Sequence, residues 1–353
     1  MFSTRKIAVG FAALATAGLL AACSTTASTP GTGAEPGTGS DGDKFRIVTV
    51  SKVEGITWFQ RMSEGVDMFN DAFSDEVEAY QTGPDSGDAA LQIQIVEDLI
   101  AQGVDAIIVV PNDPIGIGPT LQRAREAGII VGVTEATQLV GTEAIDFDIE
   151  SFDNAEFGQG FGQGLAEAMG CEGEYATSVG LLTSESHMLW VDAANAWIAE
   201  NCPDMTLVTP TPYENKNDDQ HSRQLADEIL GTFPNLKGYL ATTPSGGGGM
   251  ASALRDKGIT GFANVALTLP SVAAPDLEDG YMAYGQGWDP AGWGWALNYV
   301  ALKMLKGEPV ESGLDLQWEL GGYESVTVDG QLIVGSDIQP YRPGQFADGN
   351  FPF

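Results

Sequence analysis

Polar and aromatic side chains gather directly after several short apolar runs of the sequence. Lys52, Glu54, Trp58 and Phe59 follow the first of these runs, and Glu135 follows the fourth. If the runs are parallel strands, these residues lie at the carboxyl edge of one sheet, where open α/β sheets bind ligands. Charged groups can make paired hydrogen bonds, and aromatic faces can cover C–H surfaces. The combination predicts a binding site for a small polar molecule.

Further candidate positions follow the later apolar runs. They lie where a strand is expected to lead into the next helix, and they are Ser186, His187, Asn215, Thr243, Ser271, Gln286, Trp288 and Asp289. For Asn215 a solvated turn is an equal alternative, and His187 also fits an ordinary loop histidine. Residues 246–249 are four glycines without the Gly-Lys-Ser/Thr ending of a phosphate-binding loop. A flexible loop that enters a helix is the preferred interpretation, and close approach of its backbone to a ligand is the second.

The sequence lacks the common signatures of catalytic sites. It contains no Gly-x-Ser-x-Gly, no His-Glu-x-x-His and no Cys-x-x-Cys motif. Because 49 of the 353 residues are acidic, neighbouring carboxylates do not by themselves indicate a hydrolase. We therefore expect no catalytic residue, no metal site and no cofactor. A carboxylate-based hydrolase is kept as the less favoured alternative.

Short apolar runs alternate with longer helical patterns from Phe45 onward. The expected strands of the first set are residues 45–50, 77–80, 106–110 and 129–133. The continuous apolar run at 106–110 is typical of a strand that is buried on both faces of a parallel sheet. A second set of strands and helices of similar size follows from about residue 145. The repetition predicts an α/β protein with two lobes, each a doubly wound parallel sheet.

The N-terminus has the pattern of a bacterial lipoprotein signal sequence. Arg5 and Lys6 precede an apolar stretch, residues 7–20, and the motif Leu-Ala-Ala-Cys ends at Cys23. We expect residues 1–22 to be removed and a lipid to be attached to the Cys23 sulfur; an ordinary signal peptide is the alternative. Residues 23–43 are almost only small, hydroxylated, acidic and proline residues, which predicts a flexible tether.

The charge of the chain excludes two classes of partner. The formal net charge is −33, from 49 acidic and 16 basic residues. So acidic a surface repels nucleic acids and anionic lipid headgroups. We therefore expect no nucleic acid partner, and contact with the membrane only through the lipid on Cys23.

Two cysteines remain once Cys23 is assigned to the lipid. They are Cys171 and Cys202, each at the end of an expected helix. A single pair in an oxidising compartment favours a disulfide. Two free buried thiols are the alternative. A metal site is disfavoured because neither cysteine has a histidine or a second cysteine close by in sequence.

Four segments, spread over nearly the whole chain after the tether, carry a family resemblance. They are SKVEG at 51–55 followed by the pair Trp58-Phe59, QGVDAIIVVP at 102–111, AGIIV at 127–131 leading to Glu135, and GQGWD at 285–289. The second segment is the most specific. Together they resemble the sugar-binding type I periplasmic binding proteins, in particular the ribose-binding and autoinducer-2-binding group.

The resemblance implies a division of the chain into two Rossmann-like lobes that are joined by three hinge crossings. On that pattern the N-terminal lobe comprises residues 45–148 and about 289–313. The C-terminal lobe comprises residues 149–288 and about 314–353. The ligand binds in the cleft between them.

The resemblance also implies roles for several residues. Lys52 matches a lysine that autoinducer-2 binders use for ligand oxygens, and Gln286 matches a glutamine that bonds the ligand. Glu135 occupies an acidic position where relatives more often carry aspartate. Autoinducer-2 binders place an Asp-Gln pair at Ser186 and His187, and many sugar binders carry aspartate at Ser271. The departure at Ser186 and His187 counts against autoinducer-2 as the ligand, and the departure at Ser271 concerns the sugar binders.

The function implied by the resemblance is that of an extracytoplasmic solute-binding lipoprotein. It is expected to be a monomer that binds a small sugar, a polyol or an autoinducer-2-like compound and delivers it to an ABC permease. A ligand-sensing role with a membrane receptor uses the same fold and stands as the alternative.

Overall fold

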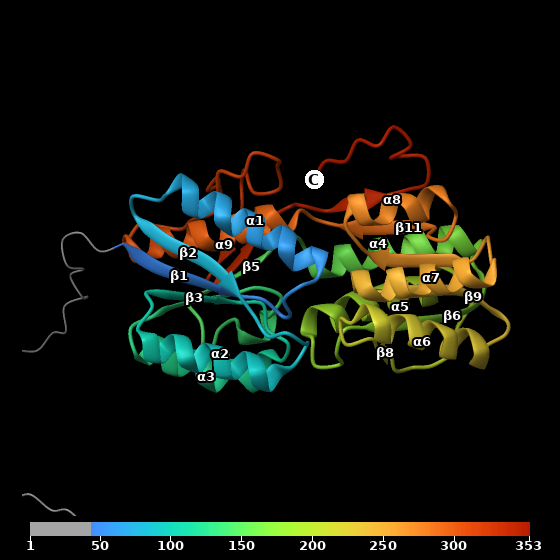
Figure 1. Ribbon diagram of the computed structural model, residues 1–353, viewed down its shortest axis with the longest axis horizontal. Coiled ribbons are helices and arrows are strands. Elements are labelled where there is room, and N and C mark those ends of the chain that lie inside the picture. The colour runs from blue at the N-terminus through green and yellow to red at the C-terminus, as the bar shows by residue number, and fades with distance from the viewer. Residues whose placement is uncertain (1–43) are drawn as a thin grey trace, which may run out of the picture. The chain divides into compact units, whose positions relative to one another are not determined.

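The computed structural model describes residues 44–353 (Figure 1). The expected signal sequence, the expected lipid attachment site Cys23 and the expected tether lie outside these residues. No helix in this part of the chain has both the length and the apolar character needed to cross a bilayer.

The first lobe is built on a seven-stranded sheet. Its strands are β1 (Phe45–Val50), β2 (Val77–Thr82), β3 (Ala106–Val109), β4 (Ile130–Val133), β5 (Phe147–Glu150), β12 (Thr327–Asp329) and β13 (Leu332–Val334). Their order in the sheet is β12-β13-β5-β4-β3-β1-β2. All neighbours are parallel except the β12–β13 hairpin.

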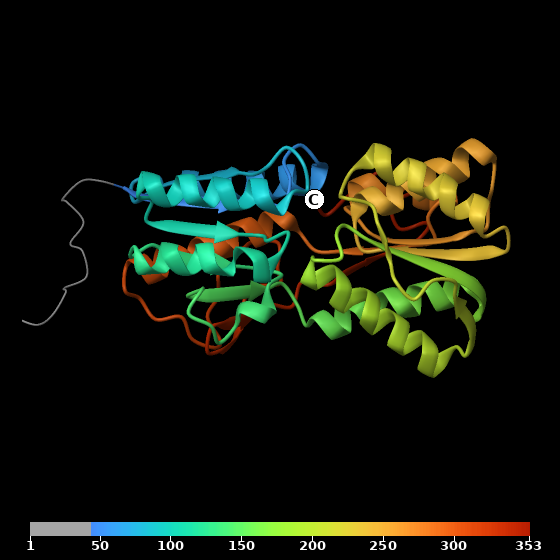
Figure 2. The same ribbon diagram turned by 90° about the horizontal axis from the view of Figure 1, so that it is seen from below.

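Helices cover both faces of this sheet (Figures 1 and 2). They are α1 (Thr57–Ala72), α2 (Ala89–Gln102), α3 (Pro114–Glu126) and α9 (Pro290–Leu305), with a short 3₁₀ helix at Thr137–Leu139. Successive side chains of a strand point to opposite faces. Ile47 therefore packs in the core under α1 and α9, whereas Val48 packs under α2 and α3. The continuous apolar runs of the sequence supply both cores.

The second lobe repeats the arrangement. Its strands are β6 (Glu172–Val179), β7 (Asp204–Leu207), β8 (Tyr213–Glu214), β9 (Leu236–Ala241), β10 (Ala263–Leu267), β11 (Tyr284–Gly287) and β14 (Gln339–Tyr341). The sheet order is β14-β11-β10-β9-β6-β7, with β8 paired to β6. Its helices are α4 (Asn154–Met169), α5 (Glu185–Asn201), α6 (Asp219–Thr232), α7 (Pro244–Lys257) and α8 (Pro270–Glu278). α4 and α5 share one core, and α6 to α8 share the other.

The chain passes between the lobes three times, from β5 to α4, from β11 to α9 and from β13 to β14. The crossings are hydrogen-bonded to one another. The Asp337 N–H donates to the Ser151 carbonyl at 2.9 Å, and the Asp289 N–H donates to Asp337 Oδ2 at 3.0 Å. The fold confirms the predicted pair of α/β lobes with mostly parallel sheets.

The C-terminal tail is divided between the lobes, whereas the sequence analysis assigned residues 314–353 to the second lobe. β13 pairs with β5 in the first sheet, and only β14 joins the second. Without β13, one edge of β5 would have no partner strand. The tail supplies that partner, and the Asp148 N–H donates to the Gln331 carbonyl at 2.8 Å. Side-chain bonds from Gln331 to the Thr142 and Ile145 carbonyls reinforce the contact.

The two remaining cysteines lie where α4 and α5 end. The Cα atoms of Cys171 and Cys202 are 4.9 Å apart, within the range of about 4.4–6.8 Å that disulfides span. The two helices approach each other closely at Gly158 and Gly162, which allows this proximity. A Cβ atom at Gly158 would lie 2.6 Å from the Trp190 carbonyl oxygen, so the helices can pack at this distance only with glycine there.

β5 carries two buried carboxyl groups. Asp148 is fully buried, and neither of its carboxylate oxygens has a hydrogen-bond partner among the described residues. Glu150 accepts a 2.7 Å hydrogen bond from Asn154 Nδ2. Burial raises the pKa of Asp148 well above its ordinary value, with the Glu150 charge as the second cause. Burial also raises the pKa of Glu150 to about 8. Glu150 therefore favours the protonated form near neutral pH, and the pKa of Asp148 is shifted in the same direction.

We predict that protonation of Glu150 makes stability depend on pH. The unfolded chain releases this proton near its ordinary pKa of 4.5, whereas the folded protein keeps it up to about 8. The free energy of unfolding therefore decreases as the pH rises through this window, by at most about 1.4 kcal/mol per pH unit. Glu150→Gln keeps the bond to Asn154 without a titrating group. It should flatten the slope and stabilise the protein at neutral pH.

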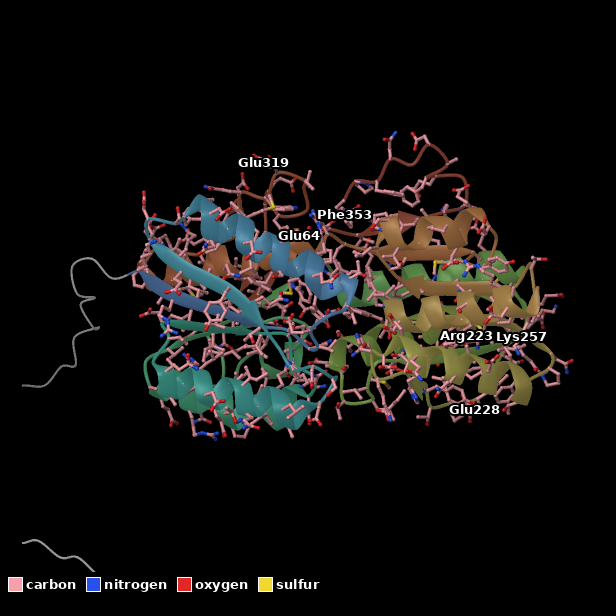
Figure 3. All side chains as sticks on the ribbon, viewed as in Figure 1. Glu64, Arg223, Glu228, Lys257, Glu319 and Phe353 are labelled. Atoms are coloured by element: carbon pink, nitrogen blue, oxygen red, sulfur yellow. A yellow bond between two sulfur atoms is a disulfide. The ribbon has the colours of Figure 1, made fainter. Side chains whose placement is uncertain are left out.

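Urea unfolding at several pH values between about 5 and 8 measures this slope. The matched control is Glu228→Gln, because Glu228 is an exposed acid on α6 (Figure 3). Equal slopes for the wild type, Glu150→Gln and the control would contradict the prediction.

Candidate ligand-binding site between the two lobes

A small cavity lies between the lobes, at the carboxyl ends of strands from both sheets. The first lobe lines it with Lys52, Ile56, Trp58, Phe59 and Glu135, and the second with His187, Asn217, Thr243, Pro244 and Leu267. Its volume is about 20 Å³, which is room for little more than one water molecule. The lobes are therefore closed on one another in this conformation, and a larger occupant requires them to separate.

A buried ion pair forms the polar centre of the cavity. Lys52 Nζ bonds to Glu135 Oε2, and the two residues are only 2% and 7% exposed. Ser186, from the second lobe, donates its hydroxyl to the same Glu135 oxygen at 2.7 Å. One carboxylate thus joins a cation of its own lobe to a hydroxyl of the other.

The backbone at Glu135 is held in a rare conformation. Its φ of 54° lies in the left-handed region, which disfavours side chains other than those of glycine, asparagine and aspartate. Such strain persists only where the surrounding structure imposes it, and it concentrates at functional sites. The strain here directs the Glu135 carboxylate to Lys52.

Two buried amide side chains position the loop that carries Lys52. Asn112 Nδ2 donates to the Lys52 carbonyl at 2.8 Å. Gln92 Nε2 donates to the Ser51 and Val110 carbonyls at 2.9 and 2.8 Å, and its Oε1 accepts from the Asn112 N–H at 2.9 Å. These bonds tie the loops after β1 and β3 together. The sequence analysis did not single out either amide.

His187 contributes a neutral ring to the cavity. It is 4% exposed, and Nδ1 accepts a 3.2 Å hydrogen bond from the Gly180 N–H. Burial lowers the pKa of His187 well below its ordinary value, and the positive charge of Lys52 adds to the effect. With Nδ1 as the acceptor, the proton of the neutral ring is assigned to Nε2, which is then a hydrogen-bond donor.

Asn215 is committed to the second lobe itself. Its Nδ2 donates to Thr243 Oγ1 at 2.7 Å and lies 3.3 Å from Ser178 Oγ, while its Oδ1 accepts from the Asn217 N–H at 3.0 Å. Thr243 in turn caps α7 by accepting from the Gly246 N–H at 3.0 Å. Both residues support the cavity wall.

Asn217 lines the cavity and was missed by the sequence analysis. Its side chain is 7% exposed, and Nδ2 has no hydrogen-bond partner in the described part of the chain. Its φ is 53°, next to a φ of 61° at Lys216. Asparagine tolerates this conformation better than most residues. An Asn in a polar loop between a strand and a helix was the available signal, but Asn215 shares it.

The structure places four other candidates away from the cavity wall. Glu54 accepts from Ser51 Oγ at 2.8 Å and lies in the groove at the cleft mouth. Ser271 is exposed at the start of α8. Gln286 turns toward α4, where its Nε2 donates to the Phe157 carbonyl at 2.8 Å and its Oε1 accepts from Tyr284 at 2.6 Å.

The fourth is Asp289, which lies at the crossing that enters α9. Its carboxylate caps this helix and receives two hydrogen bonds from the Arg61 guanidinium, at 2.9 and 3.0 Å. The residues 246–249, for which a flexible loop was preferred, belong to α7.

Aromatic rings from both lobes surround Trp288 behind the cavity. Its ring centroid lies 4.6 Å from that of Trp58, 5.4 Å from that of Trp293 and 5.8 Å from that of Trp190. Phe152, on the crossing after β5, is 5.0 Å away. We call these five residues the aromatic cluster. Trp58 also lines the cavity, so the cluster and the polar centre are contiguous.

Polar contacts outside the cavity also join the lobes. Thr183 Oγ1 donates to the Asn112 carbonyl at 2.9 Å. The Glu185 carboxylate accepts from the Thr137 hydroxyl and, at 3.0 Å, from the Gln138 N–H. The rim of the cleft is therefore closed by bonds that separate when the lobes open.

The chain is similar in sequence to known binding proteins. It is 26% identical to the D-ribose/D-allose-binding protein of Pseudomonas aeruginosa over 272 residues, 74% of this chain and 82% of that protein. It is 27% identical to the xylitol-binding protein of Mycolicibacterium smegmatis over 203 residues, 57% of this chain and 54% of that protein.

A solved structure shows the same fold. An ABC transporter solute binding protein from Clostridium phytofermentas with bound L-rhamnose superimposes with a TM-score of 0.78 at 21% identity, over 87% of this chain and 98% of that one. The family model described as "Periplasmic binding protein domain" matches residues 47–309, which hold most of both lobes and the polar centre. The chain therefore belongs to the periplasmic binding protein domain family.

Proposed function

We propose that the protein captures a small sugar or sugar-like polyol between its lobes and delivers it to an ABC importer. The observation that carries the proposal is the buried centre of Lys52, Glu135 and Ser186 beside the aromatic rings of Trp58 and Phe59. Hydroxyl groups require charged or polar partners, and sugar C–H faces require aromatic surfaces. The names of the ribose/allose-binding and xylitol-binding relatives support this ligand class.

In the proposed complex, ligand hydroxyls replace the direct contact between the lobes. The Glu135 carboxylate accepts from ligand hydroxyls in place of the Ser186 hydroxyl. Lys52, the Nε2–H of His187 and the unpartnered Nδ2 of Asn217 donate. A ligand stabilises the closed state only by contacts that it makes there and not in the open state. Residues from both lobes supply such contacts.

We also propose that binding occurs without turnover. Glycoside hydrolysis uses two carboxyl groups that flank the scissile bond. Among the described residues that line the cavity, Glu135 is the one carboxylate, and Lys52 neutralises it. This arrangement suits a hydrogen-bond acceptor better than a proton donor.

We propose an extracytoplasmic monomer, with a lipid on Cys23 and residues 23–43 as its tether. The basic and apolar start of the sequence and the Leu-Ala-Ala-Cys motif support the anchor. A disulfide between Cys171 and Cys202 fits an oxidising compartment and their 4.9 Å Cα separation.

The first prediction of this proposal is a thermal shift with at least one sugar or polyol. The probes are D-ribose, D-allose, L-rhamnose, xylitol and autoinducer-2. A ligand at about 100 times its Kd adds roughly 2.7 kcal/mol of stability, which raises the Tm by a few degrees. A shift with autoinducer-2 alone would favour the sensing alternative. A second screen with an enlarged set of sugars follows if no probe shifts the Tm, and failure there would overturn the proposal.

The second prediction concerns the charge of Glu135. Glu135→Gln keeps the shape of the side chain but removes the charged acceptor. Because hydrogen bonds to charged groups contribute about 1.5–3 kcal/mol, we expect affinity for the identified sugar to fall at least about tenfold. Calorimetric titration measures the affinity, and circular dichroism checks the fold. Glu143→Gln, at an exposed acid after β4, should bind like the wild type; equal affinity in both variants would remove Glu135 from the site.

The third prediction separates Asn217 from its backbone conformation. Asn217→Gly removes the unpartnered amide and keeps a left-handed φ at no steric cost. We expect sugar affinity to fall about fivefold or more, because a buried donor is lost. Lys216→Gly changes the neighbouring left-handed position in the same way and should leave affinity unchanged. A similar loss in both variants would show that loop flexibility, not the amide, determines affinity.

A further inference from the structure

A second hollow opens directly beside the cavity. It lies between the first turn of α1, in the first lobe, and the first turns of α7, with α6 and α8 at its sides. We call it the outer groove. Its volume is about 310 Å³, against about 20 Å³ for the cavity. Sites for small molecules begin at about 300 Å³, so the outer groove has room for an occupant of its own.

The outer groove and the cavity share part of their walls. Ile56, Trp58 and Pro244 line both. A molecule with one end in the cavity can therefore extend into the outer groove past these three side chains. Trp58 offers its ring at the junction, where a sugar ring or an aromatic group would find an apolar surface.

The four glycines of α7 are not equivalent. A Cβ atom would lie 2.7 Å from Asn215 Nδ2 at Gly246, 2.2 Å from the Ala266 Cβ at Gly247 and 2.6 Å from the Ser222 carbonyl carbon at Gly249. Close packing thus explains these three. A Cβ atom at Gly248 would have no neighbour within 4 Å, yet glycine inside a helix costs about 1 kcal/mol relative to alanine.

Gly248 lines the outer groove, and its missing side chain keeps the floor of the groove open. Packing within the protein does not require glycine at this position. An occupant of the outer groove would require it, because any side chain there would project into the space that the occupant fills.

The outer groove also presents polar groups. Ser245 is 4% exposed and lines the groove with a hydroxyl side chain. Asp219 adds a carboxylate, and Arg223, labelled in Figure 3, adds a guanidinium that pairs with Asp227 and, at 2.8 Å, with Asp256. Hydroxyl, carboxylate and guanidinium groups beside an aromatic ring are the partners that a second sugar unit requires.

We propose that the outer groove is a second subsite and that the protein binds a disaccharide or another glycoside. The terminal sugar occupies the cavity, and the unit linked to it lies over Gly248 against Trp58 and Ser245. This inference rests on the proposed capture of sugars in the cavity, and it extends the ligand beyond one sugar ring.

The test compares two substitutions in the full-length protein by calorimetric titration. Gly248→Leu fills the outer groove without a backbone clash. Gly231→Leu is the matched control, because Gly231 also lies in a helix, has no atom within 4 Å of its Cβ position and is exposed away from the groove. The probes are D-ribose, D-glucose, D-galactose, D-xylose and L-rhamnose, their 4-nitrophenyl glycosides, and the disaccharides maltose, cellobiose, lactose and xylobiose.

We expect at least one glycoside or disaccharide to bind the wild type as tightly as its free sugar or more tightly. Gly248→Leu should weaken that glycoside about tenfold or more and leave the free sugar within about twofold, because only the linked unit meets the new side chain. Gly231→Leu should change neither. Leucine favours the helix relative to glycine, so both variants should fold.

Each other outcome has a definite meaning. Binding of free sugars without any glycoside would overturn the second subsite and leave the proposed function intact. Equal loss of free sugar and glycoside in Gly248→Leu, or no loss of either, would also overturn it, since the linked unit would then not lie over Gly248. Binding of no saccharide at all would count against the proposed function itself.

Discussion

The packing of aromatic rings around Trp288 joins the two halves of the molecule. Trp58 and Trp293 come from the first lobe, Trp190 comes from the second, and Phe152 lies on a crossing. All five side chains are at most 4% exposed, and large aromatic residues dominate the energy of the interfaces that they fill. The three crossings lie beside this cluster and bond to one another. This arrangement favours bending about the crossings over sliding of one lobe along the other.

The cavity beside this aromatic cluster contains several features that cost stability. A buried ion pair loses hydration that its mutual attraction offsets only in part. Lys52 and Glu135 form such a pair, and Glu135 and Asn217 both have left-handed backbone conformations. A donor of Asn217 is left without a partner. Strain and unsatisfied groups of this kind are expected where a ligand, rather than the protein, completes the bonding.

The hydrophobic periodicity predicted the fold because the strands and helices of both lobes are each formed by one short stretch of sequence with a clear pattern. A strand with a continuous apolar run, such as residues 106–110, is buried on both faces when helices cover both sides of its sheet. The alternation of such runs with helical patterns therefore indicated both lobes. The β12–β13 hairpin could not be placed in this way. Two three-residue strands carry little pattern, and their position depends on the free edge of β5, far away in sequence.

The candidate site was predicted in part for a similar reason. Positions after strands brought Lys52, Trp58, Phe59, Glu135, His187 and Thr243 to the cavity. The position of a residue after a strand does not show where its side chain points. Gln286, which bonds within the second lobe, could therefore not be distinguished from a residue that lines the cavity. The same limit hid Asn217 behind Asn215. One residue, Lys216, separates the two asparagines, and the left-handed turn at Lys216 and Asn217 decides which amide faces the cavity.

The placement of α9 has a consequence for the order in which the lobes are completed during synthesis. This helix covers the core of the first sheet, yet its residues follow the whole of the second lobe from α4 to β11. A ribosome must therefore produce residues up to about Leu305 before the N-terminal lobe can bury that face, and β13 comes later still. The second lobe has nearly all its strands in one continuous stretch. The N-terminal lobe is thus synthesised first but completed last, and one apolar face of its sheet stays uncovered until α9 has been made.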